Sequence, residues 1–175
     1  MRSLPPYTEE QVAGFMAACT PEELVVFDFF LASMAKDAEA VTCRVGDLDF
    51  ERGGVHMRTR VEEQIFRERF VPIATPGMQR LRQHCKGKAA SELLFPPSRK
   101  NLSRRFDPEC KKVAKRAGFP DWRNFTLHRW RRTGAHRLLK SGVPLKELKV
   151  QLGLRTMSET LELLGLQRVV TITER

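Results

Sequence analysis

Residues 126–164, TLHRWRRTGAHRLLKSGVPLKELKVQLGLRTMSETLELL, hold the most informative pattern in this chain. Their apolar spacing, broken by a glycine turn, predicts three helices at residues 126–141, 144–152 and 157–165. His128 and Arg131 lie three positions apart, and residues at this spacing share one face of a helix. Two such donors on one face can both reach a single phosphate group. The spacing therefore leaves two interpretations open: the pair shares one phosphate, or His128 caps the helix or satisfies a buried carbonyl while Arg131 pairs with an acid.

Positive charge is concentrated in the segment that contains this stretch. Residues 99–149 hold 16 Lys and Arg against 4 Asp and Glu, a net charge of +12, whereas the whole chain carries +10, so the remainder carries −2. A Lys or Arg placed at a phosphate releases condensed counterions, and a basic block within a folded domain is typical of nucleic-acid binding. The alternative is a solvated basic face that only keeps the protein soluble.

Composition places the chain among globular proteins. It has 175 residues, 41% of them hydrophobic and 30% charged, which is enough for one domain with a real core, over residues 1–175. No apolar run approaches the roughly 20 residues of a membrane span, and the N-terminus has no apolar signal core, so we expect a cytoplasmic protein with no membrane partner. The four cysteines lie far apart, and we expect them to be reduced, with no metal site and no cofactor.

The rest of the chain predicts more helices and one hairpin. Thr8 with Gln11 forms a capping box, and Thr20 precedes a proline suited to a first helical turn, so helices should begin at both places. Tyr7 and Trp130 are expected to pack inside the protein. Residues 55–61 and 65–73 alternate apolar and polar side chains, as a hairpin does, and a short strand precedes them near residue 48. Further helices are predicted at residues 36–45, 76–84 and 101–117. The fold class is therefore mainly α (α+β), a helical bundle with a small antiparallel sheet.

The residues of the 126–164 stretch resemble the C-terminal half of the tyrosine recombinase (phage integrase) catalytic domain. That family carries H-x-x-R-H-T, a glycine turn, L-G-H and T-x-x-Y in this order. Leu154 stands at the L-G-H histidine and Leu163 at the nucleophilic tyrosine, while Tyr7 is the only tyrosine in the chain. The matching positions are His128, Arg131, Thr133, Gly142, Leu152, Gly153 and Thr160.

The resemblance extends over nearly the whole chain. Lys36 stands at the position of a catalytic arginine, followed by matches to the family at Glu39 and Asp47-Leu48-Asp49. Val71-Pro72-Ile73 and Leu94-Phe95-Pro96 match two further family segments. The family's hairpin carries a catalytic lysine, which this hairpin lacks. Arg58 or Arg60 occupies the strand where that lysine would lie, and we carry Arg60 forward as the family position.

The resemblance implies the tyrosine-recombinase catalytic-domain fold, without the family's N-terminal DNA-clamping domain and with residues 166–175 as a C-terminal arm. It implies double-stranded DNA as the partner. The family often exchanges its C-terminal segment between subunits, so the apolar run from Leu161 to Leu166 packs either on its own chain or on a neighbour. Exchange would give a homo-oligomer or a mixed complex.

The catalytic positions implied by the family are only partly kept. In the family, the tyrosine attacks a DNA phosphate and the arginines stabilise the developing charge. Leucine has no heteroatom, so Leu163 cannot attack, and each lost donor of this kind typically costs about 10²–10³ in rate. We therefore expect a DNA-binding protein, related to DNA integration and site-specific recombination, that does not cleave DNA. The six positions are Lys36, Arg60, His128, Arg131, Leu154 and Leu163.

Basic side chains in the charged segment are the expected DNA contacts, and three alternatives stay open. One alternative is an active recombinase that uses another nucleophile, such as Ser158 or Thr160. A second is an interaction module that partners a complete recombinase. At the site itself, Arg131 either faces a phosphate or pairs with an acid such as Glu39. The expected DNA contacts are Arg104, Arg105, Lys111, Lys112, Lys115, Arg116, Arg129 and Arg132.

Overall fold

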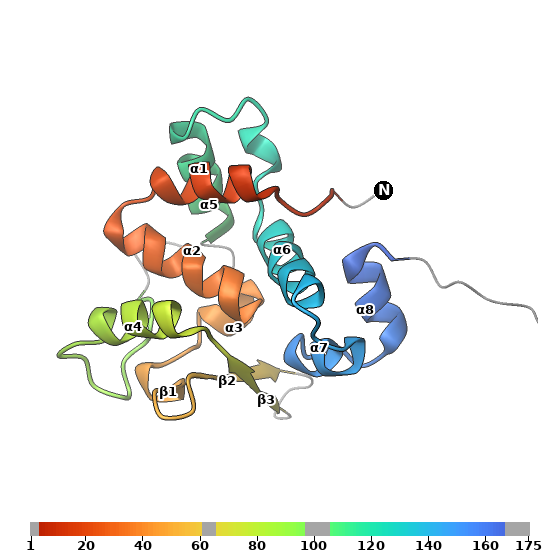
Figure 1. Cartoon of the computed structure of the whole chain (residues 1–175). Helices are drawn as coiled ribbons and strands as arrows, with labels where there is room; N and C mark the ends of the chain where they lie inside the picture. Colours follow the sequence, from red (N-terminus) through yellow and green to blue (C-terminus); the bar gives the residue numbers. More distant parts are fainter. Residues whose placement is uncertain (1–3, 61–65, 97–105, 167–175) are drawn as a thin grey trace, which may run out of the picture.

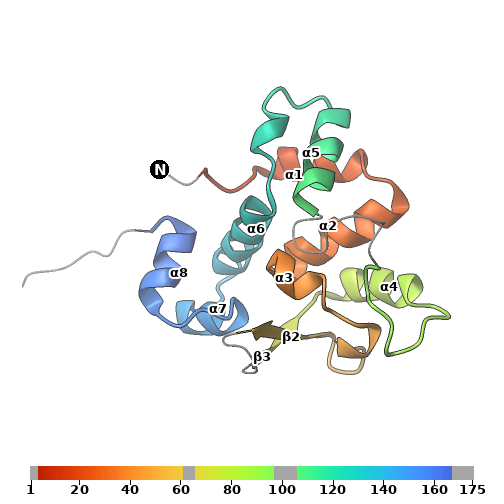
Figure 2. The ribbon, with the colours of Figure 1, turned by 180° about the vertical axis from the view of Figure 1, so that it is seen from behind.

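The computed structural model describes residues 4–60, 66–96 and 106–166. Helices predominate, and a three-stranded antiparallel sheet lies at one side, which confirms the predicted fold class (Figure 1). Helix α6 runs between the first half of the chain and the two C-terminal helices, as the view from behind also shows (Figure 2). The helices are α1 (Glu9–Ala17), α2 (Pro21–Ser33), α3 (Asp37–Ala40), α4 (Thr75–His84), α5 (Phe106–Arg116), α6 (Leu127–Lys140), α7 (Leu145–Gln151) and α8 (Met157–Leu164). The strands are β1 (Leu48–Asp49), β2 (Gly54–Arg60) and β3 (Phe66–Pro72), with short 3₁₀ turns at Val45–Asp47 and Trp122–Asn124.

Helices α1 and α2 begin where their capping residues predict. The Thr8 hydroxyl accepts from the Gln11 N–H (3.1 Å), and the Gln11 side chain accepts in return from the Thr8 N–H (3.1 Å). Thr20 and Glu23 make the same reciprocal pair at the start of α2. Each box satisfies two backbone donors that the first helical turn leaves without partners.

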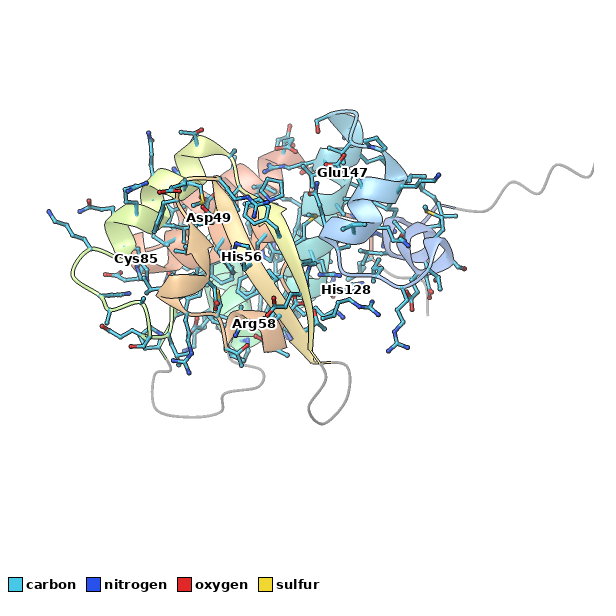
Figure 3. The ribbon with its side chains drawn as sticks, turned by 90° about the horizontal axis from the view of Figure 1, so that it is seen from below. Asp49, His56, Arg58, Cys85, His128 and Glu147 are labelled. Atoms are coloured by element: carbon cyan, nitrogen blue, oxygen red, sulfur yellow. The ribbon has the colours of Figure 1, made fainter. Side chains whose placement is uncertain are left out.

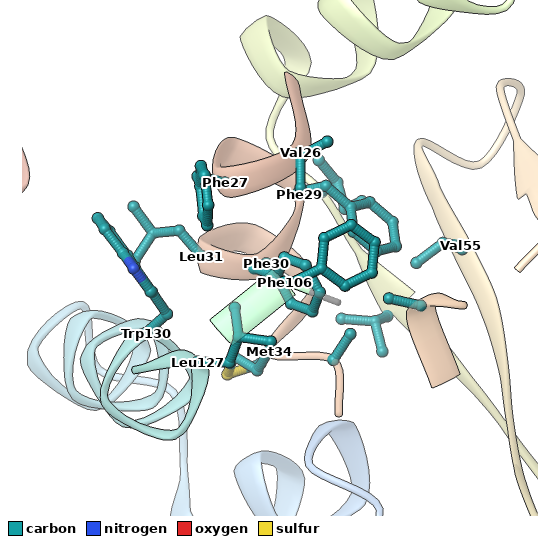
Figure 4. Packing of buried hydrophobic residues seen from close by; sticks show 14 of the residues in the cluster. Val26, Phe27, Phe29, Phe30, Leu31, Met34, Val55, Phe106, Leu127 and Trp130 are labelled. Carbon is teal, nitrogen blue, oxygen red and sulfur yellow. The ribbon is translucent and has the colours of Figure 1, made fainter. Parts of the chain in front are cut away.

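The core lies between α2 and α6. Phe27, Phe30 and Trp130 are almost entirely buried there, and Figure 4 shows the side chains of α2 packed between α6 and the sheet. Gly134 lets the two helices approach closely, because a Cβ at this position would collide with the carbonyl oxygen of Leu31. The density of apolar residues on α2 follows from this central position.

The sheet has the order β1-β2-β3, and its register decides which side chains face the helices. Thr59 lies opposite Arg67, and Met57 lies opposite Arg69. Directly opposite residues project to the same face of a sheet. Met57 and Arg69 are both buried, so this face points inward. The predicted hairpin is confirmed for these strands, while its turn at residues 62–64 lies outside the described residues, as do residues 101–105 and 167–175.

The helix predicted over residues 36–45 is only one turn long. After α3 the backbone pairs with a distant segment instead of continuing the helix. The Leu94 N–H donates to the Cys43 carbonyl (2.8 Å), and the Val45 N–H donates to the Glu92 carbonyl (2.9 Å). These two bonds replace the intrahelical bonds that sequence periodicity predicts.

The N-terminal segment is fastened to the start of α6. Tyr7 is only 4% exposed, and its hydroxyl accepts from the Thr126 N–H (2.8 Å), the residue that caps α6. The Arg129 guanidinium stacks over the Tyr7 ring (4.0 Å to the centroid) and donates to the Pro5 carbonyl (3.0 Å). The expectation that Tyr7 packs at a helix entrance is confirmed. In the described part of the chain, no helix has the length and apolar character that a bilayer crossing requires.

Candidate functional site

A groove with three adjoining hollows opens along α3, α6 and the two C-terminal helices, and Lys36 lines all three. The central hollow, about 570 Å³, is lined by His128 and Arg131 of α6, Leu154 beyond α7, and Leu163 of α8. Five of the six family positions therefore meet in one hollow. The sixth, Arg60, is placed at the end of β2, but its side chain lies outside the described part of the structure.

Separate elements bring these side chains together. Lys36 caps α3, and His128 lies in the first turn of α6, on the side of the hairpin that faces the C-terminal helices (Figure 3). Gly153 has a φ of +64° and ends α7, so that the chain turns past Leu154 toward α8. Glycine adopts this left-handed conformation without the strain of a Cβ. Leu163 then lies half-buried against the core, facing the hollow.

Arg131 is buried and holds the site together. Its guanidinium donates to the Met34 carbonyl, just after α2, and to the Leu152 carbonyl, just after α7 (2.5 Å). Burial lowers the pKa of Arg131 to about 10, while the Glu39 carboxylate opposes this shift. The guanidinium therefore stays charged at neutral pH and borders the hollow as a fixed cation.

Glu39 pairs with Arg69, whereas Arg131 donates to two carbonyls, so the alternative that Arg131 pairs with Glu39 is wrong. The Arg69 guanidinium binds the Glu39 carboxylate through two nitrogens (2.5 and 2.9 Å) and also donates to the Gln151 carbonyl (2.8 Å). Glu39 accepts in addition from the Thr59 hydroxyl and from the Lys36 N–H (2.8 Å). Burial raises the pKa of Glu39, but Arg69 and these donors outweigh burial and hold it below its usual value.

Sequence reasoning missed Arg69, although the strand pattern contains a signal for it. Arg69 lies two positions before Val71, on the face of β3 that alternation assigns to the core. A charged residue in that register requires a buried partner. Through Glu39, this pair fixes the backbone of Lys36 and thus the floor of the groove.

Burial and neighbouring positive charge lower the pKa values of the two remaining titratable residues, Lys36 and His128. Partial burial first, and then the Arg131 cation, lower the pKa of Lys36. Burial, Arg131 and Arg132 likewise lower the pKa of His128 below its usual 6.5. His128 is therefore mostly neutral at pH 7, with one ring N–H to donate and one nitrogen to accept.

Hydroxyl groups are absent from the central hollow within the described residues. Thr160 is buried and its hydroxyl donates to the Thr156 carbonyl (3.1 Å), whereas Ser158 is exposed on α8 without lining this hollow. Tyr7 is buried far along the chain, and burial raises the pKa of its phenol well above the usual 10. None of these three side chains occupies the position of an attacking group.

The predicted DNA contacts on α5 and α6 are of two kinds: lysines on the surface of α5, and arginines whose side chains already bind other groups of the protein. Lys112 and Lys115 are exposed on α5, and Lys111 is half-buried beside them. Arg116 pairs with Glu23 and donates to the Ala18 carbonyl (2.8 Å). Arg104 and Arg105 lie outside the described residues.

Arg129 and Arg132 also belong to the predicted DNA contacts, but both are buried, at 5% and 6% exposure. Arg129 binds the Pro5 carbonyl, and Arg132 binds the Leu4 carbonyl (2.6 Å). The N-terminal segment covers both side chains, so Arg129 and Arg132 are not on a surface that DNA could contact in this structure.

Comparison with known proteins agrees with this geometry. The model of the phage integrase family matches residues 7–162. The chain belongs to the phage integrase family. A search of curated proteins returned no match.

Solved structures of recombinases share the fold. The XerA recombinase is 16% identical with a TM-score of 0.80, over 95% of this chain and 62% of its own. The Tn1549 transposon integrase in complex with transposon right end DNA is 17% identical with a TM-score of 0.70, over 90% of this chain and 60% of its own. The catalytic domain of bacteriophage HP1 integrase is 18% identical with a TM-score of 0.62, over 93% of this chain and 88% of its own. This chain therefore spans about three fifths of the first two proteins.

Proposed function

We propose that this phage integrase family member binds double-stranded DNA and does not cleave it. The observation that carries the proposal is that Leu163 lines the hollow beside His128 and Arg131. The sequence resemblance assigns the family's tyrosine to this position. A hydrocarbon side chain cannot form a covalent bond to phosphorus. Leu154, in the same hollow, replaces another donor of the family.

Positive charge supports DNA as the partner. The segment from residue 99 to 149 carries the whole excess of basic residues, and Lys111, Lys112 and Lys115 project from one helix within it. Lys36 and the buried Arg131 add two cations in the groove. Among the similar structures, the Tn1549 integrase is solved with transposon DNA and the XerH recombinase with its difH substrate.

Binding in the groove would use the donors that remain. Lys36 presents a single ammonium where the family has an arginine, so it attracts a phosphate without the two-pronged grip of a guanidinium. The neutral His128 ring offers one further N–H. Such a protein would occupy or shape a recombination site without exchanging strands, and would compete there with an active recombinase.

Assembly through the C-terminal segment stays a prediction. In this structure Leu164 is buried in the chain's own core, and α8 contacts α6 and α7. The segment thus packs on its own chain here, and a homo-oligomer or a mixed complex is part of the proposal only.

The test is fluorescence-anisotropy binding to a labelled duplex of about 30 base pairs across a salt series. We expect binding that weakens steeply as salt rises, because each phosphate contact releases counterions. A nicked suicide duplex, incubated with the same protein, should give no covalent adduct on a denaturing gel. Absence of salt-dependent binding would refute the DNA-binding part, and a trapped adduct would refute the non-cleaving part.

A further inference from the structure

Charge is distributed unevenly among the three hollows of the groove. In the central hollow, Lys36 and Arg131 face the carboxylates of Glu159 and Glu162. In the hollow beside α3, about 430 Å³, the same two cations face Asp37 and Asp107. With His128 mostly neutral, the cations and carboxylates that line each of these two hollows are equal in number.

The third hollow, about 210 Å³, lies against the hairpin and holds three cations and one acid. Lys36, Arg67 and Arg155 line it together with Glu159, which leaves an excess of two positive charges. Its volume leaves room for a phosphate group and several waters, each of which takes about 30 Å³. The hairpin end is thus the most electropositive part of the groove.

The strand register directs Arg67 into this hollow. Arg67 lies opposite Thr59, whose hydroxyl binds the buried Glu39, so both residues belong to the inward face of the hairpin. Arg67 is nevertheless exposed near the end of that face. It makes no side-chain hydrogen bond or ion pair with the residues that the structure describes. Among the described residues, nothing therefore competes with a ligand for the N–H donors of its guanidinium.

Glu159 opposes this charge only in part. Its carboxylate accepts from the Arg155 N–H (2.8 Å) and the Thr156 N–H (3.0 Å), where it closes the capping box of α8. These backbone donors lower the pKa of Glu159 and hold the carboxylate against the helix start. In the described part of the chain, neither the Arg67 nor the Arg155 side chain forms a hydrogen bond or ion pair, although the Arg155 charge also lowers the pKa of Glu159.

We infer that the hairpin hollow seats a backbone phosphate of one DNA strand, bound by Arg67, Arg155 and Lys36, and that this is the strongest phosphate contact of the groove. The inference rests on the proposed DNA-binding function. Because Lys36 also lines the central hollow, the strand would pass from the hairpin hollow toward His128.

Salt-dependent DNA binding by single variants tests the inference. Arg67→Ala should weaken binding roughly tenfold at low salt and reduce the slope of log K against log salt by about 0.9, the value for one lost phosphate contact. The matched control is Arg58→Ala, in the same hairpin but paired with Glu68 on an exposed surface (2.8 Å). Arg58→Ala should leave the slope unchanged, and circular dichroism should show both variants folded.

The outcomes separate this inference from the proposed function. A slope for Arg67→Ala equal to that of Arg58→Ala, with unmodified protein still binding, would overturn the hairpin hollow alone. A larger loss for His128→Ala than for Arg67→Ala would likewise overturn it, because the central hollow would then hold the stronger contact. Failure of the unmodified chain to bind DNA would overturn the proposed function itself.

Discussion

At the scale of single residues, the sequence resemblance predicts substitutions at several family positions, and the structure brings those positions together in one hollow. Leu163 and Leu154 line the same hollow as His128 and Arg131, and Arg131 keeps its place through two backbone carbonyls. The proposed loss of cleavage would therefore lie in side-chain identity and not in the fold. It should be reversible by substitution at these positions.

Restoring the family residues should restore strand cleavage. The triple variant Leu163→Tyr, Leu154→His and Lys36→Arg supplies a nucleophile, a donor and a two-pronged cation in the positions that line the central hollow. We expect a covalent protein–DNA adduct from a nicked suicide duplex, detected on a denaturing gel. Leu163→Phe in place of Leu163→Tyr is the control, because it adds the ring without the hydroxyl. No adduct from a folded, DNA-binding triple variant would show that more than these three positions has been lost.

At the scale of elements, the buried Glu39–Arg69 pair joins α3 to the sheet and orders the groove. Its side chains are 2% and 3% exposed, so removing one partner leaves the other charged and buried. Breaking such a pair typically costs about 3–5 kcal/mol, whereas replacing both partners with apolar groups often costs little.

Acid should destabilise the protein partly through Glu39. The folded pKa of Glu39 is held below its unfolded value of about 4.3, so its contribution is complete above that value and is lost as pH falls through the lower folded pKa. Urea unfolding at pH 7 and in steps down to about pH 3 should show this loss. In Glu39→Gln, stability should be lower at pH 7 and fall less steeply in acid.

The double variant Glu39→Gln with Arg69→Met provides the control for that experiment, since it removes the unpaired buried cation. It should recover much of the stability that Glu39→Gln loses at pH 7. Equal acid sensitivity in the unmodified protein and both variants would show that other carboxylates govern the acid response.

Helix α6 depends on Tyr7 at its start. Tyr7→Phe removes the oxygen that accepts from the Thr126 N–H, and it leaves that donor without its partner. Thr126 is half-buried, so loss of this hydrogen bond should cost about 1 kcal/mol. In a protein of this size we expect the thermal midpoint to fall by roughly 2–4 °C for each kcal/mol. The thermal midpoint of Tyr7→Leu should be lower still, because this variant also removes the stacking with Arg129. An unchanged midpoint in Tyr7→Phe would refute this role of the Tyr7 hydroxyl.

Elements with local signals could be predicted from the sequence, and contacts between distant segments could not. The capping boxes at Thr8 and Thr20 mark helix starts that the structure confirms. The motif order likewise identified the positions that meet at Lys36. The short α3, the burial of Arg129 and the Glu39–Arg69 pair depend on partners 30 or more residues away. No local pattern specifies which carbonyl or carboxylate such a residue will meet.

At the scale of the whole molecule, the proposed DNA binding can draw on two basic surfaces among the described residues, and they belong to different elements. One is the hairpin hollow with Arg67 and Arg155, outside the segment that holds the net charge. The other is α5 with Lys111 and Lys112, inside that segment. A long-range electrostatic contribution should come from α5 even if the groove provides the ordered contacts, because several like charges on one face attract the duplex backbone.

Charge reversal on α5 separates a DNA-binding face from a merely solvated one. Lys111→Glu with Lys112→Glu should weaken binding to a 30-base-pair duplex at low salt by about tenfold or more, because two phosphate contacts become repulsive. Lys86→Glu is the matched control, since Lys86 is exposed in the turn after α4 and outside the basic segment. Equal affinity in the double reversal and in Lys86→Glu would show that α5 only solvates the protein. If the double reversal lowers affinity, and Arg67→Ala still reduces the slope of log K against log salt in that background, the two surfaces contact separate phosphates.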